Sequence, residues 1–259
     1  MKAVILCGGQ GTRLREETEV RPKPMVEIGG RPILWHIMKL YAAHGVNDFV
    51  LCLGYKGYQI KEFFLNYEAR MKDFTVRLGA IPSVKFHNGH DEEGWTVTLA
   101  ETGEAALTGA RVRKARRYLD GTFCLTYGDG VGDIDISGLL KFHHSHGRIG
   151  TVTAVKPPSR FGELQIDGRE VSSFVEKPQV TEGMINGGFF VFEREFVDRY
   201  FDNRDDLVLE KEPLQRLAED GQLMVWPHNG FWQPMDTFRE WKLLEDLWIG
   251  GKAPWKVWE

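Results

Sequence analysis

The chain has 259 residues, of which 42% are hydrophobic and 27% charged, as expected of a soluble globular protein with a sizeable core. Its formal net charge of -4 disfavours nucleic acid as a partner, because nucleic-acid-binding domains usually carry a basic surplus. No Ser/Pro-rich linker, charge block or internal repeat divides the sequence, so a single domain is predicted over residues 1–259.

The cysteines and the N-terminus indicate where the protein acts. Cys7, Cys52 and Cys124 lie in apolar runs and form no CxxC pattern, which is typical of a reducing compartment. The first apolar run is too short for a signal peptide with a cleavage site, and no stretch is long enough to span a membrane. We therefore expect a cytoplasmic protein with no membrane partner.

The first half of the chain alternates apolar strands with amphipathic helices. Strands are predicted over residues 2–7, 49–53, 75–78, 84–87 and 97–100, and helices after Pro32 and over residues 56–67 and 105–119. The opening order of strand, helix, strand and helix is typical of parallel βαβ units.

The pattern changes in the second half. An apolar strand from residue 122 runs into the turn "GDG", and a helix over 136–146 and a strand over 150–155 follow. The segments "GELQID", "VSSFVE" and "GGFFVF" are short and alternating, which predicts antiparallel strands added at one side of the parallel sheet. Helices are predicted again over 207–219 and 238–248. The predicted fold class is α/β, with a mixed, mostly parallel sheet flanked by helices and an added antiparallel β portion.

The stretch "GGQGTRL" follows the first strand and precedes a lysine between two prolines. Glycines let backbone amides approach a ligand closely, and a run of free amides binds anions. The dinucleotide pattern GxGxxG fails from Gly9, because Leu14 stands where glycine is required, and no P-loop pattern occurs. Arg13 and Lys23 would return to the turn after Pro22, which predicts a triphosphate site. A plain tight turn with solvated charges is the alternative.

These motifs resemble the sugar-1-phosphate nucleotidylyltransferases over nearly the whole chain. After "GGQGTRL" and "RPKP", the sequence has "YGDG", "FGEL", "VEKP", "INGGFFVF" and "WQPMDT" in the family's order. The resemblance implies a Rossmann-like fold with a β insertion and a reaction that joins an NTP to a sugar 1-phosphate with release of pyrophosphate. The stretches "GYKGYQIKEFFLNY", "WTVTLAETG" and "GKAPWKVWE" are most similar to members that use CTP and glucose 1-phosphate. The resemblance also implies that the protein forms homo-oligomers and acts in dideoxysugar synthesis for cell-surface polysaccharide.

The reaction implied by the resemblance brings two anions together, and a divalent cation can offset the charge. Mg²⁺ usually takes one or two carboxylates. By resemblance, its ligands are Asp129 of "YGDG" and Asp236 of "WQPMDT". From the residues alone, Asp129 is equally a turn aspartate and Asp236 a helix N-cap, a position that Thr237 could also fill.

The nucleotide side is assigned in the same way. The predicted nucleotide-binding residues are Leu6, Gly8, Gly9, Gly11, Thr12, Arg13, Lys23, Thr102, Gly103 and Arg111, of which Arg13 and Lys23, with Asp129, are the predicted catalytic residues. The chain lacks the "QPxGLA" loop of many thymidylyltransferases, which favours CTP and places Thr102 and Gly103 near cytosine. Arg111 contacts the triphosphate, in its own or a neighbouring subunit, or lies on a solvated helix face in "RVRKARR".

The sugar side is predicted to lie in the later motifs. The predicted sugar-phosphate-binding residues are Tyr127, Gly162, Glu176, Lys177, Asn186 and Trp232. By resemblance, Lys177 would hold the phosphate and Gly162 would lie against the sugar with its backbone. Glu176 and Asn186 could bind the hydroxyls, since their side chains hydrogen-bond. A solvated pair is the alternative for Glu176 and Lys177, and a core position for Trp232. The nucleotide-binding part is thus expected over about 1–130 and the sugar-phosphate part over about 131–259.

Other functions were compared with this one. No Ser-His-Asp or Cys-His arrangement occurs, and the histidines of "HHSH" have no matching carboxylate motif, so direct in-line attack is predicted. The nearest alternative is a thymidylyl- or uridylyltransferase. A non-catalytic nucleotide-binding regulatory subunit and an NAD-dependent oxidoreductase are weaker alternatives.

Overall fold

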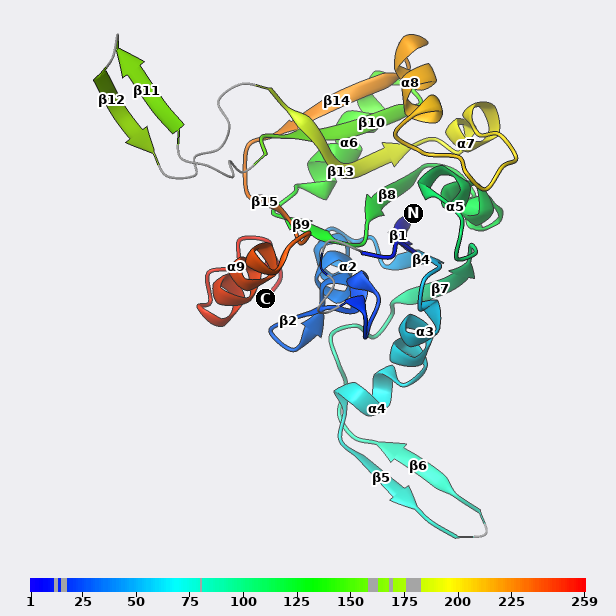
Figure 1. The fold of residues 1–259 in the computed structure, drawn as a ribbon. Coiled ribbons are helices and arrows are strands. Elements are labelled where there is room, and N and C mark those ends of the chain that lie inside the picture. Colours follow the sequence, from blue (N-terminus) through cyan, green and yellow to red (C-terminus); the bar gives the residue numbers. More distant parts are fainter. Residues whose placement is uncertain (12–13, 15–17, 80, 158–162, 168–169, 176–182) are drawn as a thin grey trace.

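The computed structural model describes the chain except for residues 12–13, 15–17, 80, 158–162, 168–169 and 176–182 (Figure 1). For 163–167 and 170–175 only the backbone is considered. In this described part, no helix combines the length and the apolar character needed to cross a bilayer. The predictions for Thr12, Arg13, Gly162, Glu176 and Lys177 fall outside the described residues.

A seven-stranded mixed sheet forms the centre of the molecule, with the strand order β14-β10-β13-β8-β1-β4-β7. Its strands are β1 (Lys2–Cys7), β4 (Asp48–Leu53), β7 (Thr96–Glu101), β8 (Phe123–Tyr127), β10 (Gly150–Val155), β13 (Ile185–Phe192) and β14 (Leu223–His228). Neighbouring strands are parallel except where β13 pairs with β8 and β10. The predicted α/β fold class is confirmed.

The sheet is buried on both faces because β1 and its neighbours are apolar at successive positions. Side chains alternate across a strand, so Ile5 packs in one core and Val4 in the other. The first core contains residues of α2 (Ile33–Ala43), α3 (Gly57–Leu65), α6 (Ile136–His146) and α9 (Phe238–Ile249), and the second contains residues of α5 (Thr108–Ala115), α7 (Glu195–Tyr200) and α8 (Glu212–Glu219). Helices therefore cover both faces, as predicted.

Two predicted helices are shorter than expected. The helix predicted over 105–119 begins at Thr108 as α5 and ends in a 3-10 turn over Arg116–Tyr118. The helix predicted over 207–219 begins only at Glu212, because Pro213 lies in its first turn, where its ring and missing N–H are tolerated.

The prediction that antiparallel strands lie together at one side of the sheet is wrong for β13. This strand lies inside the main sheet, between β8 and β10. Of the three predicted segments, β11 (Glu163–Asp167) and β12 (Glu170–Val175) form an antiparallel pair separate from the main sheet. Alternation predicted the strands but not the order in which they pair.

The edge strand β14 was not predicted. Its sequence "LMVWPH" contains Pro227, which lacks a backbone N–H and argues against a central strand. Because β14 is the last strand of the sheet, beside β10, the missing N–H of the proline destabilises the sheet less there than it would in a central strand.

Three two-stranded pairs complete the described strands. They are β2 (Glu27–Ile28) with β3 (Arg31–Pro32), β9 (Gly130–Gly132) with β15 (Trp232–Pro234), and β5 (Phe74–Arg77) with β6 (Ser83–Phe86). The short helix α4 (Tyr67–Met71) leads into β5, and Figure 1 shows β5 and β6 projecting away from the body of the molecule.

Candidate functional site

Two distant aspartates meet because two short strands pair. β9 pairs with β15 so that Gly130 lies opposite Pro234, and the N–H of Met235 donates to the carbonyl of Asp129 at 2.8 Å. Asp129 immediately precedes β9, and Asp236 follows β15 by two residues. The pairing therefore brings both carboxylates to the end of β8, at the carboxyl edge of the parallel strands where ligands of such sheets gather.

Lys23 joins these two carboxylates. Its Nζ donates to Oδ2 of Asp129 at 2.7 Å and to Oδ1 of Asp236 at 2.5 Å. Lys23 opens a 3-10 turn after Pro22, whose extended backbone directs the chain back toward the sheet. The lysine is 7% exposed, so its charge is held by the two aspartates rather than by water.

The surroundings keep Lys23 protonated. Burial lowers its pKa, but the charges and hydrogen bonds of Asp129 and Asp236 outweigh burial and hold the pKa above its usual value. The ammonium therefore stays charged throughout the neutral range. The ammonium of Lys23 is thus in direct contact with the carboxylates of both Asp129 and Asp236.

Asp236 does not cap the helix that follows it. Thr237 is the N-cap of α9: its hydroxyl accepts from the N–H of Glu240, and Glu240 reaches back to the N–H of Thr237. Glu240 also accepts from the N–H of Asp236 at 2.8 Å. The N-cap interpretation of Asp236 is therefore wrong, because the cap is filled and its carboxylate contacts Lys23.

A cavity of about 520 Å³ lies beside this cluster. The predicted residues that line it are Leu6, Gly8, Gly9, Gly11, Lys23, Arg111, Tyr127, Asp129 and Asp236. Gly11 adopts a φ of +63°, and a Cβ there would lie 2.8 Å from Thr18 Cγ2. The glycine turn thus forms one wall of the cavity, with the ammonium and both carboxylates at the same opening.

Residues 104–108 also line the cavity and were not predicted to do so. This segment leads into α5, whose first residue is Thr108, and was expected to be helical from residue 105. Gln10, Pro24 and Gly128 are further lining residues without a sequence assignment. Gln10 lies inside "GGQG", so its position beside the glycines was the signal that could have found it.

Arg111 lies at the base of the glycine turn. It is buried, and its guanidinium donates to the carbonyls of Gly8 and Leu53 at 2.9 Å and to that of Gly103 at 2.8 Å. The ends of β1 and β4 and the segment after β7 are thereby held together. The interpretation of Arg111 as part of a solvated helix face is wrong. Its contact with a triphosphate stays a prediction.

Gly8 leaves room for this arginine in its hydrogen-bonded position. A Cβ at Gly8 would lie 2.1 Å from Cζ of Arg111, and a Cβ at Gly54 would lie 2.4 Å from its Nη1. Both glycines leave room for the guanidinium. A close approach of backbone to a ligand, as first expected, is therefore not the only reason for glycine at position 8.

Thr102 and Gly103 do not line the main cavity. Thr102 is buried, and its hydroxyl donates to the carbonyl of Leu53 at 2.5 Å and accepts from Arg111 at 2.8 Å. Gly103 has a φ of +93° and offers its carbonyl to Arg111. Their predicted place near cytosine stays a prediction.

Three of the predicted sugar-side residues meet where β8 ends and β13 begins. Nδ2 of Asn186 donates to the hydroxyl of Tyr127 at 3.4 Å, and Nε1 of Trp232 donates to the carbonyl of Gly187 at 2.7 Å. Tyr127 also donates to Glu210, and burial raises the pKa of this tyrosine. Tyr127 thus contacts Asn186 and Glu210, while Trp232 contacts the backbone next to Asn186.

The sequence has no carboxylate motif that matches the histidines of "HHSH", but in the fold His143 contacts a carboxylate. The buried ring contacts Oε1 of Glu193 at 3.1 Å and Oγ1 of Thr151 at 2.8 Å. Burial lowers the pKa of His143 despite the carboxylate. None of the three residues lines the cavity at the glycine turn, so they are not part of this site.

The carboxylate pair is the candidate metal centre. Asp129 and Asp236 supply the hard oxygens that Mg²⁺ prefers, in the number that it usually takes from protein. Within the described residues, no group of three or more His, Cys, Asp or Glu side chains could hold a metal ion. The donor set therefore fits a cation that obtains its other ligands from phosphate and water.

Replacing Gly8 by alanine should destabilise the protein, whereas the same change at Gly9 should not. The new Cβ at position 8 would overlap the hydrogen-bonded guanidinium of Arg111, at a cost of about 1–3 kcal/mol. A Cβ at Gly9 meets nothing within 4 Å. Thermal unfolding of both variants measures the difference, and equal melting temperatures would contradict the packing argument.

Comparisons with known proteins identify the family of the chain. A family model described as nucleotidyl transferase matches residues 2–238. Glucose-1-phosphate cytidylyltransferase of Salmonella typhi is 54% identical over 261 residues, which cover 100% of both chains. Mannose-1-phosphate guanylyltransferase catalytic subunit beta of Xenopus tropicalis is 33% identical and covers 91% of this chain and 62% of its own.

Among solved structures, UDP-glucose pyrophosphorylase complexed with UDP-glucose superposes with a TM-score of 0.68, covering 96% of this chain and 98% of its own. At 12% identity this likeness shows the fold alone. The family match and the full-length relatives decide the assignment. The chain belongs to the nucleotidyl transferase family.

Proposed function

We propose that this protein joins CTP and α-D-glucose 1-phosphate to give CDP-glucose and pyrophosphate. The observation that carries the proposal is the contact of Lys23 with both Asp129 and Asp236 at the opening of the glycine-walled cavity. The likeness to the glucose-1-phosphate cytidylyltransferase of Salmonella typhi, over the full length of both chains, supports this nucleotide and this sugar.

The chemistry requires no covalent enzyme intermediate. An oxygen of the sugar phosphate attacks the α-phosphorus of CTP, the bond from that phosphorus to the bridging oxygen breaks, and the electron pair leaves with pyrophosphate. The attacking phosphate is already ionised at neutral pH. Catalysis is therefore positioning and charge neutralisation.

In this proposal Asp129 and Asp236 hold a divalent cation, and Mg²⁺ is the expected one. Such an ion would offset the charge on the α-phosphate and on the leaving pyrophosphate. Lys23 contacts one oxygen of each carboxylate, so its ammonium would compete with the cation for these ligands. An ammonium displaced from the carboxylates would bind phosphate oxygens instead.

The roles of the remaining site residues are predictions that belong to this proposal. Arg13, with Thr12, would join Lys23 on the triphosphate, and Lys177 would align the attacking phosphate. Gly162, Glu176, Asn186 and Trp232 would surround the sugar. The division into a nucleotide-binding part over about 1–130 and a sugar-phosphate part over about 131–259 follows from these assignments.

We further propose a homo-oligomer acting in the cytoplasm. The three cysteines are buried and unpaired, which agrees with a reducing compartment. The product would serve dideoxysugar synthesis for cell-surface polysaccharide. A non-catalytic regulatory subunit is disfavoured, because such a protein has no use for two carboxylates converging on one lysine.

Replacing Lys23 or Asp129 by alanine should lower turnover by about 100-fold or more, because each removes charge stabilisation at the reacting phosphates. Pyrophosphate release with CTP and glucose 1-phosphate measures the effect. Lys2→Ala is the control, since Lys2 pairs with Asp120 at the opposite end of β1. Near wild-type rates in a folded Lys23 or Asp129 variant would remove these roles.

The choice of base is tested by offering CTP, dTTP and UTP separately with glucose 1-phosphate. We expect CTP to give the highest kcat/KM. A higher value with dTTP or UTP would favour a thymidylyl- or uridylyltransferase and leave the site chemistry unchanged.

Replacing Lys23 by glutamine should tighten the binding of Mn²⁺ in the absence of nucleotide. The variant removes the ammonium that competes for Asp129 and Asp236, so the Kd for the metal should fall several-fold. Electron paramagnetic resonance of free Mn²⁺ measures the change, with Lys2→Gln as control. An unchanged Kd would show that the carboxylates do not bind the metal or that Lys23 does not block them.

A further inference from the structure

An exposed apolar face lies on the β5–β6 hairpin. The register pairs Phe74 with Phe86 and Val76 with Val84, so these four side chains share one face of the hairpin. The rings of Phe74 and Phe86 lie 5.6 Å apart. We call these four residues the hairpin face. Each of them is at least 40% exposed.

Such a face is normally covered. An antiparallel sheet with one apolar and one polar side packs its apolar side against a core, and an isolated two-stranded hairpin is marginally stable in water. Figure 1 shows the hairpin pointing away from the rest of the molecule. The described part of the chain supplies no cover for the hairpin face, which therefore has the properties of an interaction surface.

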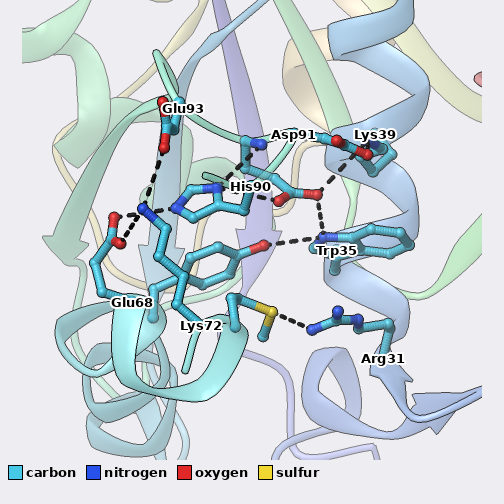
Figure 2. Close-up of polar contacts among 11 residues, drawn as sticks. Arg31, Trp35, Lys39, Glu68, Lys72, His90, Asp91 and Glu93 are labelled. Atoms are coloured by element: carbon cyan, nitrogen blue, oxygen red, sulfur yellow. Dashed lines mark hydrogen bonds and ion pairs between the residues drawn. The ribbon is translucent and has the colours of Figure 1, made fainter. Parts of the chain in front are cut away.

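The base of the hairpin is held in a fixed direction. Lys72, before β5, contacts Glu68 at 2.7 Å and Glu93, after β6, at 3.1 Å, so the two legs are joined (Figure 2). Glu92 accepts from Nε1 of Trp35 in α2 at 3.0 Å and lies 3.6 Å from Lys39. The hairpin is thus an arm anchored on the main body, and little freedom is lost when it binds.

A groove of about 470 Å³ lies at the root of this arm, between α3, α4 and β7. Its apolar lining is Phe64, Leu65, Tyr67, Trp95, Val97 and Leu99. We call it the α3–β7 groove. It runs along β7, which ends the seven-stranded sheet in the described part of the chain. Leu65 is 81% exposed, so the groove is open to a partner.

The charges of the arm and the groove are opposite. Residues 74–87 include Arg77 and Lys85 and no acidic residue. The groove is lined by Glu68, Glu92 and Glu93 and by His90, in addition to its apolar residues. Two lysines of the same chain, Lys39 and Lys72, pair with these glutamates, so three carboxylates share two ammonium groups. Two arms packed on each other would bring like charges together, whereas an arm in the groove of another copy brings opposite charges together.

We propose that the hairpin face of one copy of this chain packs into the α3–β7 groove of a second copy. The hairpin cannot fill the groove of its own chain, because it points away from the groove that lies at its root. This inference names the surface of the homo-oligomer proposed above, and it does not depend on the reaction.

Contact between copies is tested first by cross-linking. The chain is co-expressed in two differently tagged forms, one with Val84→Cys and one with Leu65→Cys, and treated with a short bismaleimide. The native cysteines are buried and should not react. We expect a covalent dimer that carries both tags, and none when Leu65→Cys is replaced by Lys141→Cys on the exposed side of α6. Cross-links between two Val84→Cys chains with none to Leu65→Cys would overturn the proposal in favour of packed arms.

Assembly is tested second by mass. Sedimentation velocity should give a wild-type mass above the 29.6 kDa of one chain. Val84→Glu on the hairpin face and Leu65→Glu in the groove should each shift the protein toward that mass. The neighbouring changes Ser83→Glu and Ala69→Glu should not. A monomeric wild-type protein, or variants that keep the wild-type mass, would overturn the proposal, while turnover with CTP would report separately on the proposed function.

Discussion

The contact of one buried ammonium with two carboxylates determines how the site is built. Lys23 comes from a turn after the first strand, Asp129 from the segment after β8 and Asp236 from the segment between β15 and α9. Without Lys23, two carboxylates would face each other at the edge of the sheet with no cation between them, which is unfavourable for both. The lysine therefore makes the carboxylate pair tolerable in the folded protein before any phosphate or metal arrives.

The rest of the fold positions these three residues. The parallel strands direct their carboxyl ends to one edge, the β9–β15 pair brings Asp129 and Asp236 to the same place, and the capping box fixes the start of α9. Arg111 joins three segments below the glycine turn by hydrogen bonds to their carbonyls. The site thus depends on backbone connections as much as on the side chains that would touch substrate.

Hydrophobic periodicity was sufficient to predict the first βαβ units, because buried parallel strands and amphipathic helices have distinct local patterns. The position of β13 was not predictable in this way, since no local pattern specifies which strands become neighbours. The proximity of Asp129 and Asp236 was not predictable from local patterns either, because it depends on the pairing of two three-residue strands. Only the motif resemblance linked the two residues. The burial of Arg111 was not predictable, because a basic run has the same sequence pattern whether one of its arginines is solvated or buried.

The space around Arg111 has a consequence for how this sequence can change. Gly8 and Gly54 come from different strand ends, yet both lack a side chain where the same guanidinium lies. A larger residue at either position requires the guanidinium to leave its hydrogen bonds, or the arginine to be lost or shortened. Substitutions at these three positions should accordingly appear together in descendants of this sequence, as a linked set inherited as one unit.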